Sequence, residues 1–181
     1  TYRPLYFGVI GWEAVCGLGA VVLMAGGAYQ FRGNYTDSLP TAAALRELGF
    51  QTFIVDYRLS PYTQEEDALD VARAVRFVRK NAEVYGIDPD DIAVMGFSAG
   101  GHLAAHYSTA YDCPEVRALF PDSKPVQASV LCYPVITADP AWAHLGSFDA
   151  LTGKTDRTPE ELLNFSCDKL VTAHTPPAFL W

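Results

Sequence analysis

Clustered positive charge is missing from this sequence. The 181 residues contain 13 Lys and Arg against 21 Asp and Glu, which gives a formal net charge of −8 and a pI near 4.8. The basic side chains are scattered along the chain, whereas a nucleic-acid backbone is bound by a Lys- and Arg-rich face. We therefore expect no nucleic-acid partner, and the sequence leaves the oligomeric state open.

Long apolar runs are also lacking. The most apolar stretch, residues 15–28, is about fourteen residues long, whereas a helix needs about 20 to cross a bilayer. The stretch has no basic leader and it ends in glycines, unlike a secretory signal peptide. We therefore expect no membrane span, no signal peptide and a cytoplasmic location.

Cysteine is sparse, and metal-binding patterns are incomplete. The four cysteines never form a C-x-x-C pair, which excludes a small disulfide scaffold and favours free thiols: Cys16, Cys113, Cys132 and Cys167. His102 and His106 have the spacing of a zinc-binding helix, but Leu103 replaces the glutamate of that motif and no third ligand is evident. We expect no metal and no cofactor.

The sequence does contain short apolar runs that alternate with helical patterns. Strands are predicted at residues 19–24, 51–55, 92–95, 126–132 and 177–181. Helices are predicted at residues 36–48, 62–84, 99–111 and 158–163, and the last begins with a capping box of Thr158, Pro159 and Glu161. This alternation predicts one α/β domain with a parallel sheet, helices on both faces and chemistry at the carboxyl ends of the strands.

Ser98 is the candidate nucleophile. It lies in Gly96-Phe97-Ser98-Ala99-Gly100, between a predicted strand and a predicted helix. A sharp strand-to-helix turn exposes the serine hydroxyl, and its crowding demands small residues two before and two after the serine. The N–H of Ala99, at the start of the helix, is then placed to stabilise an oxyanion. The alternative is a glycine-rich packing turn in which Ser98 is an ordinary helix cap.

A second glycine-rich segment follows the first long strand. Gly26 and Gly27 come directly after residues 19–24, where the other oxyanion donors are expected. Glycine lets the backbone approach a substrate oxygen closely. Both glycine-rich segments are predicted at the same edge of the sheet, and we therefore expect Gly26, Gly27 and Ala99 to form an oxyanion hole beside Ser98.

Five segments together resemble the α/β-hydrolase serine esterases. Residues 25–29 resemble their His-Gly-Gly-Gly or Pro-Gly-Gly-Gly-Tyr oxyanion loop, although Ala25 and Ala28 replace two positions of that loop. Residues 55–61 resemble the Asp-Tyr-Arg-Leu-(Ala/Ser)-Pro segment of the hormone-sensitive-lipase-like branch, and residues 96–104 match its nucleophile turn. Residues 133–136 and 143–147 resemble bacterial acetyl-xylan and short-chain carbohydrate esterases. We place no segment of residues 1–20 in these families.

The resemblance implies an α/β-hydrolase three-layer sandwich over residues 1–181 that lacks the C-terminal strands. Its triad order is Ser, then Asp or Glu, then His. In the resembling esterases the acid follows the strand that begins like residues 175–181, and the histidine comes later still. We therefore expect both partners of Ser98 beyond Trp181. His102 is expected to be a core histidine and His174 a structural one.

Three further side-chain assignments follow from these patterns. Tyr29 is a candidate for the substrate pocket that could equally pack in the core, and His144 is a candidate for substrate contact. Asp56 and Arg58 are expected to form a structural ion pair.

The expected activity is hydrolysis of short acyl esters, above all acetyl esters of carbohydrates, with a small-molecule ester as the partner. The alternatives are a catalytically incomplete α/β-hydrolase domain that binds a ligand or partner, and a serine peptidase of the same fold.

Overall fold

The computed structural model describes residues 7–9, 18–61 and 67–181. The strands are β1 (Phe7–Val9), β2 (Ala20–Met24), β3 (Gln51–Val55), β4 (Ile92–Phe97), β5 (Ala128–Cys132) and β6 (Ala178–Leu180). The helices are α1 (Ser38–Glu47), α2 (Asp67–Lys80), α3 (Ala82–Tyr85), α4 (Ala99–Ala110), α5 (Pro114–Leu119), α6 (Leu145–Thr152) and α7 (Pro159–Leu163), with a 3₁₀ turn η1 (Cys167–Lys169).

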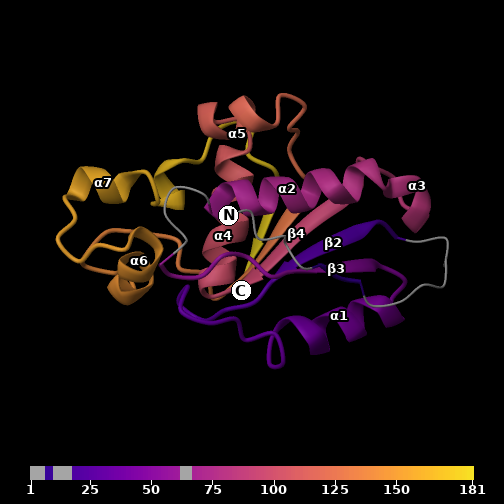
Figure 1. The fold of residues 1–181 in the computed structure, drawn as a ribbon, viewed down its shortest axis with the longest axis horizontal. Coiled ribbons are helices and arrows are strands. Elements are labelled where there is room, and N and C mark those ends of the chain that lie inside the picture. Colours follow the sequence, from indigo (N-terminus) through magenta and orange to yellow (C-terminus); the bar gives the residue numbers. More distant parts are fainter. Residues whose placement is uncertain (1–6, 10–17, 62–66) are drawn as a thin grey trace.

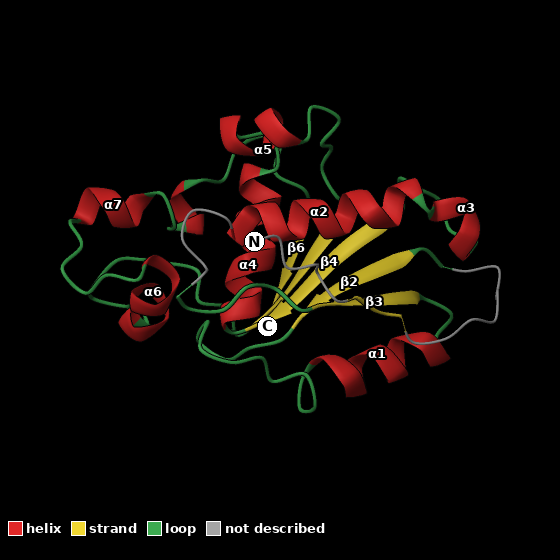
Figure 2. Cartoon of the chain, viewed as in Figure 1, coloured by secondary structure: helices red, strands yellow, loops and turns green. Residues whose placement is uncertain are grey.

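The strands form one sheet in the order β1-β3-β2-β4-β5-β6. β1 pairs antiparallel with β3, and every other pair is parallel. Helix α1 covers one face of this sheet, and α2 and α4 cover the other (Figure 1). Helices α6 and α7 lie at one end of the molecule (Figure 2). The predicted α/β class with a mostly parallel sheet is confirmed.

Alternate side chains of the central strands fill two separate cores. Val22 of β2 packs in the larger core with side chains of α2 and α4. Its neighbours Val21 and Leu23 pack in the smaller core, beside Ala42 of α1. Because successive strand side chains point to opposite faces, a strand covered on both sides must be apolar throughout. This is why β2 reads as a continuous apolar run.

Several element boundaries differ from the sequence-based ones. The predicted helix at residues 62–84 is divided into α2 and α3, with Asn81 between them, and its residues 62–66 lie outside the described part. Strand β1, α5 and α6 were not predicted. The three residues of β1 carry too little periodicity to mark a strand. The equally short β6 was predicted because it lies in the longer apolar segment 177–181. The predicted capping box is confirmed: Thr158 Oγ1 accepts from the Glu161 N–H at 3.2 Å, and Glu161 Oε2 accepts from the Thr158 N–H at 2.8 Å.

The register places the carboxyl ends of three strands side by side. Met24 at the end of β2 lies opposite Gly96 of β4, and Phe97 of β4 lies opposite Cys132 of β5. The two glycine-rich segments that follow β2 and β4 therefore meet at one edge of the sheet. Among the helices that the structure describes, none is long and apolar enough to cross a membrane.

Candidate active site

Ser98 occupies a strained position between β4 and α4. Its backbone has φ 51° and ψ −116°, outside the regions that L-residues favour. The residues around it must be small: a Cβ added to Gly96 would lie 2.0 Å from the Gly100 carbonyl oxygen, and a Cβ added to Gly100 would lie 2.3 Å from the Met24 carbonyl oxygen. The sterics that the sequence predicted for a nucleophile turn are therefore present.

Backbone hydrogen bonds hold this conformation. The Ser98 N–H donates to the Cys132 carbonyl oxygen at 3.0 Å. The Ser98 carbonyl oxygen accepts from the N–H groups of Val135 at 3.2 Å and His102 at 3.0 Å. A residue stays in a sparsely populated backbone region only when its surroundings over-determine it, and such strain gathers at functional sites. The side chain of Ser98 is meanwhile half-buried, at the surface of the sheet edge.

The segment Ala25–Tyr29, here called the oxyanion loop, lies against the nucleophile. A Cβ added to Gly26 would be 3.1 Å from the Cβ of Ser98. The loop then turns through three successive residues with positive φ: Gly27 at 137°, Ala28 at 51° and Tyr29 at 60°. At Gly27 only glycine fits, because an added Cβ would lie 2.1 Å from the Phe31 carbonyl oxygen. The two predicted segments are thus brought together.

The three predicted oxyanion donors are not equivalent. The Gly26 N–H donates to Asp37 Oδ2 at 2.8 Å, so it is already engaged in this structure. Ala99 is the first residue of α4, where an N–H has no intrahelical acceptor and the helix dipole favours negative charge. Gly27 is half-buried and follows Gly26, the glycine that lies against Ser98. The geometry therefore favours Gly27 and Ala99 as donors, and the oxyanion hole at Gly26, Gly27 and Ala99 stays a prediction.

Sequence reasoning missed Asp37. This residue is the N-cap of α1, and its carboxylate reaches back to the oxyanion loop. The negative charge of Asp37 also acts on Cys132 and Tyr133, at the end of β5. Burial raises the pKa values of both side chains, and the charge of Asp37 raises them further. A sequence signal existed, because Asp is a preferred N-cap residue, but the predicted helix began one residue earlier.

Tyr29 does not line the surface of the site. Its side chain is 1% exposed, and its hydroxyl oxygen lies 2.6 Å from Nδ1 of His102. This geometry favours the packing alternative for Tyr29. His102 itself is fully buried, with Nε2 2.7 Å from the Phe165 carbonyl oxygen, so its predicted core role is confirmed.

His144 is exposed at the start of α6, where its Nδ1 lies 2.8 Å from Ser147 Oγ. This contact fixes the ring within its own segment, and a role in substrate contact stays a prediction. His174 lies in a loop, where its N–H donates to Thr172 Oγ1 at 3.2 Å.

Comparison with known proteins places this site in a family. The BD-FAE family model matches residues 16–136, which include the oxyanion loop and the nucleophile turn. The chain belongs to the BD-FAE family.

Two relatives of this BD-FAE chain carry names that refer to xylan. The chain is 35% identical over 161 residues to an acetylxylan esterase of Xylanibacter ruminicola. This match covers 88% of the chain and 32% of that protein. The chain is also 32% identical over 169 residues to endo-1,4-beta-xylanase B of Butyrivibrio fibrisolvens. That match covers 89% of the chain and 26% of the xylanase. The chain thus spans about a third or less of the length of these relatives.

A solved structure matches over the whole BD-FAE chain. It is an acetyl ester-xyloside bifunctional hydrolase from Caldicellulosiruptor lactoaceticus, with a TM-score of 0.86 and 33% identity over 100% of this chain and 66% of that one. The resemblance to α/β-hydrolase esterases is therefore confirmed.

The expected ion pair between Asp56 and Arg58 is wrong. Arg58 instead binds Asp70 of α2, with Nη2 2.7 Å from Oδ1, while its backbone N–H donates to Oδ2 at 2.9 Å. Asp56 binds Arg32 at 3.3 Å and accepts a hydrogen bond from Asn34 at 2.8 Å. The structural role holds, but each side chain finds its partner on another element.

Replacing Asp70 with asparagine is expected to lower the free energy of unfolding by about 1.5–3 kcal/mol, because a hydrogen bond to a charged group contributes about that much to stability. Asp70 is 1% exposed and also binds Arg73 at 3.2 Å. Urea unfolding measures the change. The matched control is Asp122→Asn, since Asp122 binds Arg76 at 3.0 Å in an exposed setting, where pairs contribute little. Equal losses for the two variants would contradict this interpretation.

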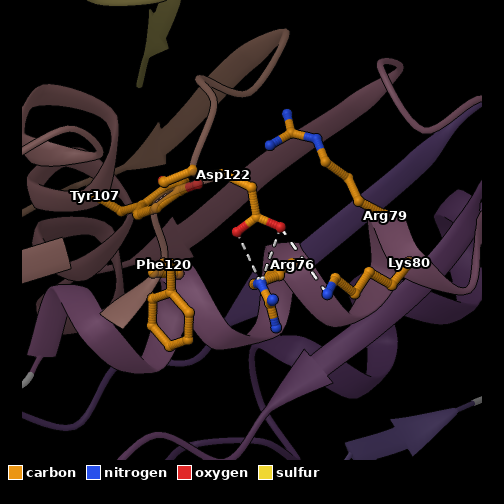
Figure 3. A pocket seen from close by; sticks show the side chains of 8 residues that line it. Arg76, Arg79, Lys80, Tyr107, Phe120 and Asp122 are labelled. Atoms are coloured by element: carbon orange, nitrogen blue, oxygen red, sulfur yellow. Dashed lines mark hydrogen bonds and ion pairs between the residues drawn. The ribbon is translucent and has the colours of Figure 1, made fainter. Parts of the chain in front are cut away.

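A shallow pocket in the described part lies away from Ser98, between α2, α4 and the loop after α5. Its lining is strongly basic, with Arg76, Arg79 and Lys80 from α2 (Figure 3). These cations are engaged: Asp122 binds Arg76 and Lys80, and the Arg79 guanidinium donates to carbonyl oxygens of Pro89, Lys124 and Pro125. The cluster ties α2 to neighbouring loops.

Proposed function

We propose that this chain carries the nucleophile and oxyanion hole of a serine carboxylesterase that hydrolyses short acyl esters, above all acetyl esters of carbohydrates. The observation that carries the proposal is the strained turn at Ser98, held against the glycine-rich oxyanion loop. An acetylxylan esterase among the relatives and an acetyl ester-xyloside hydrolase among the structural neighbours support the substrate class.

The chemistry follows from the arrangement of these groups. Ser98 Oγ attacks the carbonyl carbon of the ester while a general base takes its proton. The carbonyl oxygen becomes an oxyanion that accepts hydrogen bonds from the N–H groups of Gly27 and Ala99. The alcohol then leaves with a proton from the conjugate acid, and water hydrolyses the acyl-serine. The resemblance implies that the base and its acid partner follow β6 in the chain.

A fluorophosphonate probe tests the proposal on the full-length protein. An activated Ser98 Oγ displaces fluoride from phosphorus and becomes covalently labelled, and peptide mass spectrometry locates the label. We expect labelling at Ser98 and none in the Ser98→Ala protein. Absence of labelling in a protein of verified intact mass would overturn the proposal and favour a ligand-binding domain without catalysis.

Substrate chain length provides a second test. We expect acetate release from acetylated xylo-oligosaccharides, and faster hydrolysis of p-nitrophenyl acetate than of p-nitrophenyl octanoate. Preference for the octanoate ester, without acetate release, would contradict the proposed substrate class while leaving the esterase chemistry intact.

A further inference from the structure

One buried hydrogen bond joins the two segments that carry the oxyanion donors. Tyr29 ends the oxyanion loop, two residues after Gly27, and His102 lies in α4, three residues after Ala99. The Tyr29 hydroxyl oxygen and His102 Nδ1 are 2.6 Å apart, although 73 residues separate them in sequence. The two donors therefore belong to segments that are tied together behind the site.

The protonation of this pair follows from its second partner. His102 Nε2 lies 2.7 Å from the Phe165 carbonyl oxygen, which can only accept. Nε2 therefore carries the proton, and in the neutral imidazole Nδ1 is the acceptor of the Tyr29 hydroxyl. The His102 ring is fully buried, and the Phe148 ring packs edge-on against it at 5.4 Å between centroids. Its orientation is thus set on several sides.

The rest of the loop is held to other elements. The Tyr57 hydroxyl donates to the Ala25 carbonyl oxygen at 2.6 Å, and burial raises the Tyr57 pKa, which keeps that donor protonated. The Ser60 N–H donates to the Tyr29 carbonyl oxygen at 2.8 Å. These contacts connect the loop to the segment after β3. The contact between Tyr29 and His102 is a side-chain hydrogen bond that links the loop directly to the nucleophile helix.

We propose that Tyr29 and His102 are positioning residues that fix the distance between the oxyanion donors Gly27 and Ala99. The proposal rests on the proposed esterase function. The oxyanion loop passes through three residues of positive φ, including the non-glycine residues Ala28 and Tyr29. Such a conformation needs external restraint, and the bond to His102 supplies it from the helix that carries Ser98.

The test compares Tyr29→Phe with Tyr107→Phe in the full-length protein. Tyr107 is an internal match: it is 1% exposed, it belongs to α4, and its hydroxyl donates to the Lys124 carbonyl oxygen at 3.1 Å, away from the oxyanion loop. Each variant removes one buried phenol hydroxyl and retains the ring. Both are expected to lower Tm by a few degrees.

Only Tyr29→Phe is expected to affect catalysis. With p-nitrophenyl acetate, its kcat should fall about 10-fold or more while KM stays within about twofold, because misplaced donors weaken binding of the transition state more than that of the substrate. Tyr107→Phe should keep kcat within about twofold of wild type. Equal kcat for the two variants would overturn the proposal.

Two substitutions of His102 separate positioning from simple packing. Asparagine can place its Oδ1 near the position of Nδ1 and accept the Tyr29 hydroxyl, whereas the glutamine amide reaches toward the position of Nε2 and Phe165. We expect His102→Asn to keep kcat within about threefold of wild type. We expect kcat of His102→Gln to fall as far as that of Tyr29→Phe. The reverse order would contradict the assignment.

A readout without catalysis separates this proposal from the proposed function. In a Ser98→Ala background, Tyr29→Phe should speed hydrogen exchange at the backbone amides of Gly26 and Gly33. The Gly26 amide donates to the Asp37 carboxylate, and the Gly33 amide donates to the Gly26 carbonyl oxygen. Tyr107→Phe should leave these rates unchanged. Equal rates in the two variants would overturn positioning. A wild-type protein without esterase activity would instead overturn the proposed function.

Discussion

Replacing Ser98 with alanine is expected to abolish ester hydrolysis, lowering kcat by about 10⁶-fold, which is the loss seen when a serine nucleophile is removed. The fold should survive, because alanine keeps the Cβ that serine already carries at the φ of 51° and loses only the hydroxyl, which makes no helix-capping hydrogen bond. Steady-state hydrolysis of p-nitrophenyl acetate measures the loss, and circular dichroism checks the fold. Wild-type activity in the Ser98→Ala protein would show that Ser98 is not the nucleophile.

Ser98→Gly is the companion variant. Glycine adopts positive φ without a Cβ penalty, and strain at a functional residue costs about 1–3 kcal/mol. We therefore expect this variant to be as inactive as Ser98→Ala and to have a Tm equal to or above that of the alanine protein. A markedly lower Tm would show that the turn is not strained.

Gly100→Ala is expected to cause a large loss of stability, about 3 kcal/mol or more. The added Cβ would lie 2.3 Å from the Met24 carbonyl oxygen and 2.4 Å from the Ala25 carbonyl oxygen, and both are backbone atoms that cannot rotate away. Helix α4 must then move off the end of β2, at a cost at or above the usual range for overpacking. Because the same shift displaces Ser98 from the oxyanion loop, activity should be lost as well.

Gly146→Ala provides the control for this substitution. Gly146 lies in α6, and an added Cβ would meet only the His144 ring carbon at 3.8 Å. Alanine is favoured over glycine within helices by about 0.5–1 kcal/mol, so this variant should be as stable as wild type or more stable. Urea unfolding of both proteins measures the difference, and similar losses in the two would argue against a steric cause at Gly100.

The nucleophile turn could be predicted because its cause is local. A sharp turn from a strand into a helix crowds its own neighbours, so Gly96 is required by the nearby backbone of Gly100 and Gly101. Gly100 is part of the same short motif, although the atoms that exclude a side chain there belong to Met24 and Ala25, at the end of β2. The cause is also local for the capping box at Thr158, whose hydrogen bonds join residues three apart. Apolar runs likewise identified β2 and β3 almost to the residue, because burial on both faces leaves a continuous apolar pattern.

The oxyanion hole at Gly26, Gly27 and Ala99 stays a prediction. Gly26 and Gly27 share the same glycine-rich signal, and nothing in that signal shows which backbone N–H a side chain already engages. The distinction depends on Asp37, which the start of α1 places beside the loop. In the same way, Tyr29 could be assigned to the pocket or to the core, and the choice depends on His102, far away in the chain.

The sequence alone therefore determined the α/β class, the strained turn at Ser98 and the oxyanion loop at the same sheet edge, since each arises from periodicity or sterics over a few residues. The tertiary structure decided the partners: Arg58 with Asp70, the Gly26 N–H with Asp37, and Tyr29 with His102. The physical reason is that a charged or polar side chain pairs with the partner that the fold brings within about 3 Å. The sequence contains many residues of each suitable type, and it does not show which of them the fold brings that close.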